Sequence, residues 1–295
     1  MNDSPLFSIM IANHNDGKYI REALASVEKQ TYKNYEVVIV DDGSNDDSIN
    51  ILKELESKSN YRVYYNNKNY GCGYTKRKCV ELAKGELCGF LDADDALTNE
   101  ALGVMVEKHL QQPDASLIYS RYHYCDKDLT PLTVSSHQCQ IPYGNSFLNY
   151  KRGAISHFVS FKKDFYNKTI GINEHFKIAE DIDLYLKLEE VGKTMFIDKP
   201  LYYYRCGTGN NTSLDRNIIR AAYWEIIAKT DACKRRNCDY ETIELPLIEE
   251  ITDSIAFLNT RKVYNSKEYK LGYYLLHPLK IVKKILSCNK HKTNK

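Results

Sequence analysis

The sequence predicts an α/β protein with a mostly parallel central sheet flanked by helices and a helical C-terminal extension. Two observations lead to this prediction. Short apolar runs alternate with segments whose apolar residues recur at helical spacing. The runs are almost continuously apolar, as in strands that helices cover on both faces. The chain of 295 residues is long enough for one large domain or two smaller ones.

Strands and helices are expected to alternate over the first 120 residues. The expected strands are 6–12, 36–40, 61–65, 87–91 and 115–120. The expected helices are 20–27, 49–55, 75–85 and 98–110. We expect Ser44 or Asn45 to cap the second helix and Gly85 to end the third. Strands separated by helices form βαβ units, in which ligands bind beyond the carboxyl ends of the parallel strands.

Composition narrows the class of protein. The net charge of +2 gives no case for nucleic-acid binding, and 43% hydrophobic with 27% charged residues is typical of a globular protein. The nine cysteines are irregularly spaced without a CxxC pair, which disfavours a zinc ribbon. Without a recognisable secretion signal, they predict reduced thiols in a cytoplasmic protein. No apolar run approaches the ~20 residues of a membrane-spanning helix.

Two clusters of carboxylates follow predicted strands. Asp41 and Asp42 end the second strand, and Asp92, Asp94 and Asp95 follow the fourth. Both clusters are expected in one crevice, where carboxylates repel each other unless a cation lies among them. Oxygen ligands of this kind suit Mg²⁺ or Mn²⁺, which then carries phosphate oxygens. The alternative for the second cluster is a solvated turn in which Asp95 caps the next helix.

The residues around these clusters resemble a known family. The stretches FSIMIANHNDGKYIREALASVEKQTYKNYEVVIVDDGSNDDS (7–48) and NYGCGYTKRKCVELAKGELCGFLDADD (69–95) resemble the opening of a family 2 glycosyltransferase with the GT-A fold. The resemblance extends from about residue 6 to about residue 213. It implies transfer of a sugar, usually with inversion, from a nucleotide diphosphate donor such as a UDP-sugar to a glycan or lipid-linked saccharide. Surface polysaccharide synthesis is the implied role.

The resemblance implies roles for residues on the donor side. Asp42 matches the carboxylate that accepts from the base, with Asp41 beside it. Ala12 would contact the base through its backbone. Lys76 stands near the nucleotide where the family more often has Arg, which keeps the charge and loses a bidentate contact.

The implied metal site lies in the DADD stretch. Asp94 would ligate Mn²⁺ or Mg²⁺, and Asp92 would lie near the ribose and diphosphate as a second ligand. The stretch YYYRCGTGNNTS (202–213) resembles the segment that closes over the diphosphate, so Arg205 is implied to neutralise phosphate charge. Gly207 stands where the family often has His, so water is expected there. The alternative for this stretch is a plain surface loop.

The stretch AEDIDLYLKL (179–188) resembles the family's ED motif. Asp181 matches the carboxylate that takes the proton from the acceptor hydroxyl. The alternative is that Glu180, Asp181 and Asp183 only form the acidic first turn of a helix, which the helix dipole favours. Residues 157–177 are expected to belong to the pocket that selects the sugar or acceptor, although their aromatic side chains could equally belong to the core.

The chain is expected to divide into a catalytic domain, 1–213, and a helical region, 214–295. Within the first, the nucleotide-binding half is expected to end near residue 120 and the acceptor half to cover 121–213. The stripe Leu275, Leu279, Val282 and Leu286 with nearby lysines predicts a basic amphipathic helix. It would lie on the anionic inner face of the cell membrane or pack against the catalytic domain.

Two other functions remain open from the sequence. A non-catalytic nucleotide-sugar-binding subunit is favoured by Gly207 and disfavoured by intact Asp94 and Asp181. A nucleotidyltransferase would usually carry a Gly-rich basic loop after the first strand, where this chain has NHNDGK.

Overall fold

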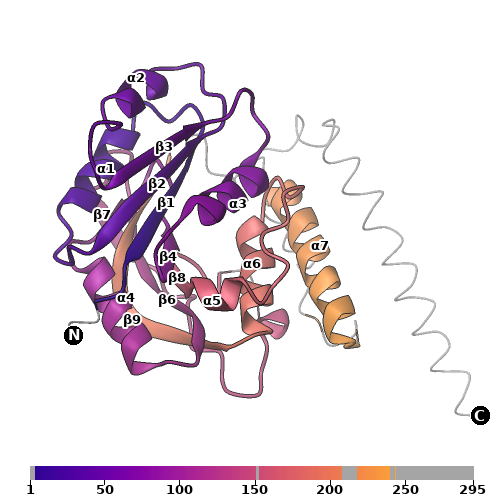
Figure 1. Cartoon of the computed structure of the whole chain (residues 1–295). Helices are drawn as coiled ribbons and strands as arrows, with labels where there is room; N and C mark the ends of the chain where they lie inside the picture. The colour runs from indigo at the N-terminus through magenta and orange to yellow at the C-terminus, as the bar shows by residue number, and fades with distance from the viewer. Residues whose placement is uncertain (1–3, 151–152, 208–217, 240–242, 244–295) are drawn as a thin grey trace, which may run out of the picture.

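The computed structural model describes residues 4–150, 153–207, 218–239 and residue 243 (Figure 1). A sheet of nine strands runs through this part of the chain, with helices on both of its faces. The predicted amphipathic helix from Leu275 to Leu286 lies outside the described residues, as do residues 208–213 of the predicted loop. None of the described helices is both long and apolar enough to cross a membrane.

Four strands form the parallel half of the sheet in the order β3-β2-β1-β4. Their bounds are β1 Phe7–Asn13, β2 Tyr35–Asp41, β3 Tyr61–Tyr65 and β4 Leu87–Phe90. All four were expected within two residues of these bounds. Successive side chains of a strand point to opposite faces, so Ile9 packs in the core on one face and Met10 in the core on the other. Burial on both faces explains the continuous apolar runs.

The second half of the sheet is mixed. Strand β8 pairs antiparallel with both β4 and β6, while β6 and β9 are parallel. Short strands β5 and β7 pair antiparallel with β9 and β6. The bounds are β5 Ala96–Leu97, β6 Ala115–Cys125, β7 Pro131–Val134, β8 Val159–Lys162 and β9 Lys193–Arg205. Strand β6 is therefore longer than the segment 115–120 expected, and the boundary expected near residue 120 falls inside it.

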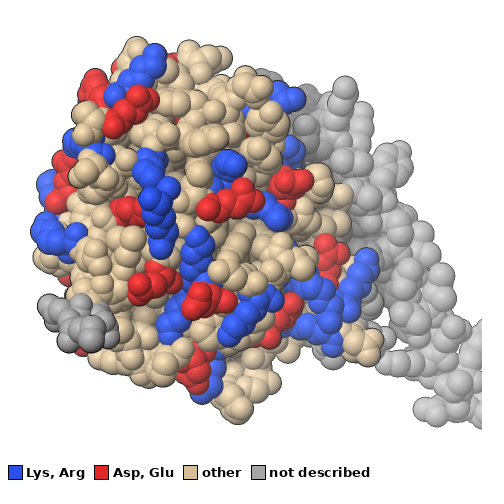
Figure 2. Space-filling model, in the orientation of Figure 1, with Lys and Arg blue, Asp and Glu red and all other residues tan. Residues whose placement is uncertain are grey.

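The helices pack in two layers (Figure 1). Helices α1, α2 and α4 supply residues to the core on one face of the sheet, and α3, α6 and α7 to the core on the other. The bounds are α1 Ile20–Glu28, α2 Ser48–Lys53, α3 Cys72–Leu82, α4 Ala101–Gln111, η1 Phe147–Asn149, α5 Lys163–Tyr166, α6 Glu180–Glu189 and α7 Ile218–Arg236. Acidic and basic side chains are interspersed over the face drawn in Figure 2, in keeping with the small net charge.

Two predictions about helix ends are wrong. Helix α3 ends at Leu82 rather than Gly85, because the backbone is already extended at Ala83, with ψ of 137°. Gly85 instead allows a close approach, since a Cβ there would lie 2.6 Å from the carbonyl oxygen of Leu6. Neither Ser44 nor Asn45 caps α2. The Ser44 hydroxyl donates to Asp41 Oδ1 at 2.6 Å, and the Asn45 backbone N–H donates to a side-chain oxygen of the β1–α1 loop.

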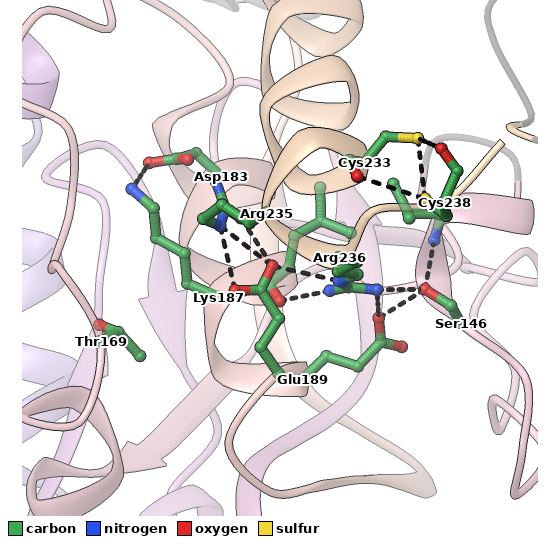
Figure 3. Close-up of polar contacts among 12 residues, drawn as sticks. Ser146, Thr169, Asp183, Lys187, Glu189, Cys233, Arg235, Arg236 and Cys238 are labelled. Atoms are coloured by element: carbon green, nitrogen blue, oxygen red, sulfur yellow. Dashed lines mark hydrogen bonds and ion pairs between the residues drawn. The ribbon is translucent and has the colours of Figure 1, made fainter. Parts of the chain in front are cut away.

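Helix α7 is tied to the end of α6 by ion pairs (Figure 3). Arg235 Nη2 lies 2.8 Å from Glu190 Oε1, and Arg236 Nη1 lies 2.8 Å from Glu189 Oε2. Ser146, just before η1, donates its hydroxyl to the same Glu189 oxygen at 2.7 Å. These contacts hold α6 between α7 and the segment before β8.

Candidate active site

Asp42 fixes the loop that leads into α3. The residue follows β2 and its side chain is buried. Its Oδ1 accepts from Asn66 Nδ2 at 2.8 Å and from the Tyr70 backbone N–H at 3.0 Å, and its Oδ2 accepts from the Gly71 N–H at 2.8 Å. The carboxylate therefore determines where α3 begins and where its first turn points.

Asp41 plays a similar part for the loop after β1. Its Oδ1 accepts from Asn13 Nδ2 at 2.7 Å and from the Ser44 hydroxyl at 2.6 Å. The other amide atom, Asn13 Oδ1, is buried and has no hydrogen-bond partner among the described residues. On the side of β1 that faces β4, the Met10 carbonyl accepts from the Leu91 N–H. Carbonyl directions alternate along a strand, so the Ala12 carbonyl points to this same side. It lies past the last residue of β1 that pairs with β4.

The DADD turn after β4 is held by β9. The Tyr202 hydroxyl donates to Asp95 Oδ2 at 2.8 Å and accepts from the Asp92 backbone N–H at 3.1 Å. The Arg205 backbone N–H donates to Asp95 Oδ1 at 2.7 Å. The alternative role of Asp95 as a helix cap is wrong, because α4 begins at Ala101 with no side-chain cap and Asp95 is buried against β9.

Arg205 is fully buried behind this turn. Its Nε donates to the Asp94 carbonyl at 2.6 Å, its Nη1 to the Lys127 carbonyl at 2.6 Å, and its Nη2 lies 2.5 Å from Glu22 Oε2. The guanidinium also lies 4.7 Å from the centre of the Tyr19 ring. Arg205 thus joins β9, the DADD turn and α1.

The carboxylate of Asp94 is half-buried beside other acidic groups. Burial, the charge of Asp92 and the charge of Asp16 together raise the pKa of Asp94 to about 7. A bound cation would relieve this repulsion, so the donor set fits a divalent metal. Across the residues that the structure describes, no three His, Cys, Asp or Glu side chains are grouped to hold a metal ion, so further ligands would have to come from substrate and water.

Lys76 connects the DADD turn to the start of α6. Its Nζ lies 2.8 Å from Glu180 Oε1, at the start of α6, and 3.7 Å from Asp92 Oδ1, in the DADD turn. The thiol of Cys72 also donates to Glu180 Oε1, at 3.1 Å. The Lys76 charge holds the pKa of Glu180 below its usual range, although burial opposes this.

Asp181 lies in the first turn of α6, next to this ion pair. The helix starts after Ala179, whose backbone is left-handed with φ of 62°, so the chain turns sharply before the acidic residues. Burial, followed by the neighbouring Glu180 charge, raises the pKa of Asp181 to about 6, and Lys76 opposes the rise. Such a carboxylate is ionised at neutral pH and is a stronger base than an ordinary aspartate.

Asp183 belongs to a different environment. Its Oδ2 lies 2.6 Å from Lys187 Nζ, and both side chains are almost fully buried (Figure 3). The same ammonium donates to the Gly171 carbonyl at 2.8 Å. The pair fixes α6 to the loop before it, and Asp183 is not among the residues that line the cavity at Asp181.

A cavity brings three of the predicted site residues together. Its polar lining consists of Lys76, Asp92, His157, Glu180, Asp181 and Tyr185. Its apolar lining consists of Phe90, Val159, Phe161, Ile172 and Leu184. Of the predicted residues, Ala12, Asp41, Asp42, Asp94 and Arg205 are not part of this lining.

His157 was not singled out from the sequence. The only signal was its place at the start of the segment 157–177, which the sequence assigned to a specificity pocket. That segment supplies both core and cavity, since Phe158 is buried in the core while Val159 and Phe161 line the cavity.

Gly207 is exposed with φ of +80° and has open space around it.

Sequence comparisons relate the chain to enzymes of polysaccharide synthesis. The model of the family described as "Glycosyl transferase family 2" matches residues 8–171. The chain is similar to chondroitin synthase of Escherichia coli, with 32% identity over 222 residues, which cover 73% of this chain and 31% of the relative. It is also similar to hyaluronan synthase of Pasteurella multocida, with 26% identity over 94% of this chain and 29% of the relative. The chain thus spans about three tenths of the length of these curated relatives.

A shorter relative and two solved structures match over most of their length. Glycosyltransferase GlyG of Streptococcus pneumoniae is 23% identical over 90% of this chain and 93% of the relative. TarS of S. aureus in complex with UDP-GlcNAc has a TM-score of 0.62 at 20% identity, covering 91% of this chain and 75% of that one. A mannosyltransferase of Pyrobaculum calidifontis in complex with GDP-Man and Mn²⁺ has a TM-score of 0.59 at 14% identity. The match covers 100% of this chain and 82% of the mannosyltransferase chain. These likenesses identify the fold as GT-A.

Proposed function

The chain belongs to glycosyl transferase family 2, and from this premise we propose that it moves a sugar from a UDP-sugar to a hydroxyl of a glycan or lipid-linked saccharide. The observation that carries the proposal is the cavity that Asp92, from the DADD turn, and Asp181, from α6, line together with Lys76. A donor-side carboxylate and a basic carboxylate on one cavity are what a displacement at an anomeric carbon requires.

In the proposed reaction, Asp181 accepts the proton of the acceptor hydroxyl. The hydroxyl oxygen attacks the anomeric carbon as the bond from that carbon to the diphosphate oxygen breaks, and the nucleoside diphosphate leaves. A single displacement inverts the configuration at the anomeric carbon. The raised pKa of Asp181, about 6, makes it basic enough to assist and low enough to be ionised at neutral pH.

The donor is proposed to bind along the carboxyl ends of β1, β2 and β4. Asp42, Asp41 and the Ala12 backbone are the proposed contacts of the base, as the resemblance implies. Asp42 also acts indirectly, because its hydrogen bonds to the Tyr70 and Gly71 N–H groups hold the start of α3. That helix carries Lys76, whose ammonium is proposed to lie beside the diphosphate.

We propose Asp94 as the protein ligand of Mn²⁺ or Mg²⁺, with Asp92 as the second. The acidic environment that raises the pKa of Asp94 supports this assignment. A divalent cation there supplies charge neutralisation of the departing diphosphate. Arg205 is proposed to contribute positive charge near the same phosphates and to hold the Asp94 carbonyl in place through its Nε–H.

A peripheral position on the inner face of the cell membrane is also proposed. It rests on the sequence pattern of residues 271–295 alone, where an apolar stripe alternates with lysines. A lipid-linked acceptor would then be held at the same surface as the enzyme.

The test is a panel of nucleotide sugars assayed for released nucleoside diphosphate, with and without saccharide acceptors. We expect turnover with one or a few UDP-sugars, slow hydrolysis without acceptor and faster release with the correct acceptor. Binding of UDP without turnover of any donor would favour the non-catalytic subunit instead. Release of inorganic pyrophosphate from a nucleoside triphosphate and a sugar phosphate would favour a nucleotidyltransferase.

A further inference from the structure

His157 lies in a stack of aromatic rings at the edge of the cavity. Its ring centre is 4.9 Å from that of Tyr202 with an angle of 13° between the planes, and 5.5 Å from that of Tyr204 with an angle of 17°. Tyr202 is fully buried, and its hydroxyl is bonded to the Asp92 N–H and to Asp95. The tyrosine that holds the DADD turn therefore also fixes the plane of the His157 ring.

The ring nitrogens of His157 differ from those of His109 and His137. His109 bonds to the Ser160 hydroxyl at 3.0 Å, and His137 bonds to the Tyr124 hydroxyl at 3.0 Å. For His157, no hydrogen-bond or ion-pair partner is found among the described residues, although the side chain lines the cavity with Asp92 and Asp181. The side chain is partly exposed, so its ring nitrogens are open to solvent and to whatever occupies the cavity.

The protonation state of His157 suits a neutral ligand group. Burial lowers the pKa of His157, and the nearby Lys76 charge adds to this, while Asp92 and Glu180 oppose it. A neutral imidazole has one N–H donor and one nitrogen acceptor. A sugar hydroxyl can donate to one such nitrogen or accept from the other, so an imidazole held in a fixed plane can recognise a hydroxyl by its direction.

We propose that His157 determines specificity for the transferred sugar through a hydrogen bond between its imidazole and one hydroxyl of that sugar. The inference rests on the proposed function, since the anomeric carbon must lie between the donor side, marked by Asp92, and the base, Asp181. His157 lines that same space and stacks on the tyrosine that holds Asp92. A site that pairs a sugar hydroxyl discriminates against the analogue without it, because one hydrogen bond to the imidazole is then lost.

The experiment pairs variants of His157 with deoxygenated donors. The accepted donor and its mono-deoxy analogues are compared by kcat/KM for the wild-type enzyme, His157→Phe and His157→Leu. Phe keeps a flat ring for the stack, and Leu keeps similar bulk without a ring. For one analogue we expect the wild-type enzyme to lose about tenfold in kcat/KM, as for one neutral hydrogen bond. Both variants should lose about as much with the parent donor and should not discriminate against that analogue.

Discrimination is a ratio within each variant, so loss of folded protein does not affect it. The affinity for UDP alone, measured by calorimetry, should stay within about twofold, because UDP lacks the transferred sugar. The inference is overturned if His157→Phe keeps the wild-type kcat/KM, since stacking alone would then suffice. It is also overturned if both variants discriminate among the analogues as the wild-type enzyme does. Failure of the wild-type enzyme to turn over any donor would instead overturn the proposed function, and this inference with it.

Discussion

The ammonium of Lys76 lies 2.8 Å from the carboxylate of Glu180, 104 positions later in the chain. This contact joins α3, which follows β3, to the first turn of α6. It places one positive and one negative charge beside Asp181, and the two act on its pKa in opposite directions. The pKa of Asp181, the proposed base, therefore depends on a pair of charges from two separate parts of the fold.

The first prediction concerns the pH profile of kcat. Asp181 must be ionised to accept a proton, so kcat is expected to fall as the pH drops through its pKa. The charge of Lys76 lowers this pKa, so Lys76→Met should move the acidic limb to higher pH. The charge of Glu180 raises it, so Glu180→Gln should move the limb to lower pH. Both variants lose the ion pair between Lys76 and Glu180, so an effect of that loss alone would move the acidic limb in the same direction in both. Such a result would contradict the electrostatic explanation.

The second prediction assigns the base. Asp181→Asn keeps the shape of the side chain and removes its basicity, so kcat should fall by roughly 10²–10⁴-fold. Affinity for UDP should be nearly unchanged, because the base acts on the acceptor. Donor turnover and calorimetric binding measure the two effects, and a parallel loss of both would argue against the assignment.

Asp183→Asn is the matched control for that variant. It makes the same chemical change two residues later in the same helix, but it breaks the buried ion pair with Lys187. We expect the free energy of unfolding to fall by about 3–5 kcal/mol, since one charge is left buried without its partner. The kcat of the protein that remains folded should stay near that of the wild-type enzyme.

The third prediction is a requirement for a divalent metal. EDTA should abolish turnover, and Mn²⁺ or Mg²⁺ should restore it. Asp94→Ala should remove both turnover and the metal-dependent part of UDP binding, because one ligand serves both. Undiminished turnover in EDTA would remove the metal from the mechanism and leave Lys76 and Arg205 as the proposed counter-charges of the diphosphate.

The fourth prediction separates two roles of Arg205. Its guanidinium holds two backbone carbonyls and a carboxylate while only 1% exposed. Arg205→Met should therefore lower the free energy of unfolding by about 1.5–3 kcal/mol, as expected when hydrogen bonds to a charged group are lost. Urea denaturation measures this. Unchanged stability with a loss of diphosphate affinity would mean that the residue serves the donor alone.

The fifth prediction concerns the membrane. Truncation before Gly272 should give a folded protein that no longer sediments with vesicles containing anionic lipid and still hydrolyses donor slowly. Binding of the full chain should weaken as salt rises, because each lysine near such a surface contributes about 1 kcal/mol that salt screens. A truncated protein that is insoluble or much less stable would show that the stripe packs in the core.

Much of the parallel half of the fold could be predicted, because burial on both faces leaves a pattern that is local in the sequence. The strand bounds from Phe7 to Phe90 depend on runs of neighbouring residues. The mixed half could not be predicted in the same way. Pairing of β8 between β4 and β6 depends on contacts between distant segments, and polar residues in the second part of β6 hide its length.

The candidate site likewise contains residues that the sequence reveals and residues that depend on distant contacts. The resemblance brought Lys76, Asp92 and Asp181 to attention, and all three line one cavity. Burial of Arg205 was missed, since its partner Glu22 is 183 positions away and no local pattern reveals the contact. His157 was missed for a related reason: its ring is placed by Tyr202, which is contributed by β9.

The position of β8 has a consequence for any attempt to study the proposed nucleotide-binding half by itself. Strand β8 pairs with β4 through Leu87 to Gly89, yet it is contributed by residues 159–162. A fragment that stops near residue 120 would leave one side of β4 with unpaired N–H and carbonyl groups, and would end in the middle of β6. Such an open strand is a template on which other chains add. Insolubility of that fragment would therefore reflect the missing neighbour strand and would say nothing about whether the nucleotide contacts are intact.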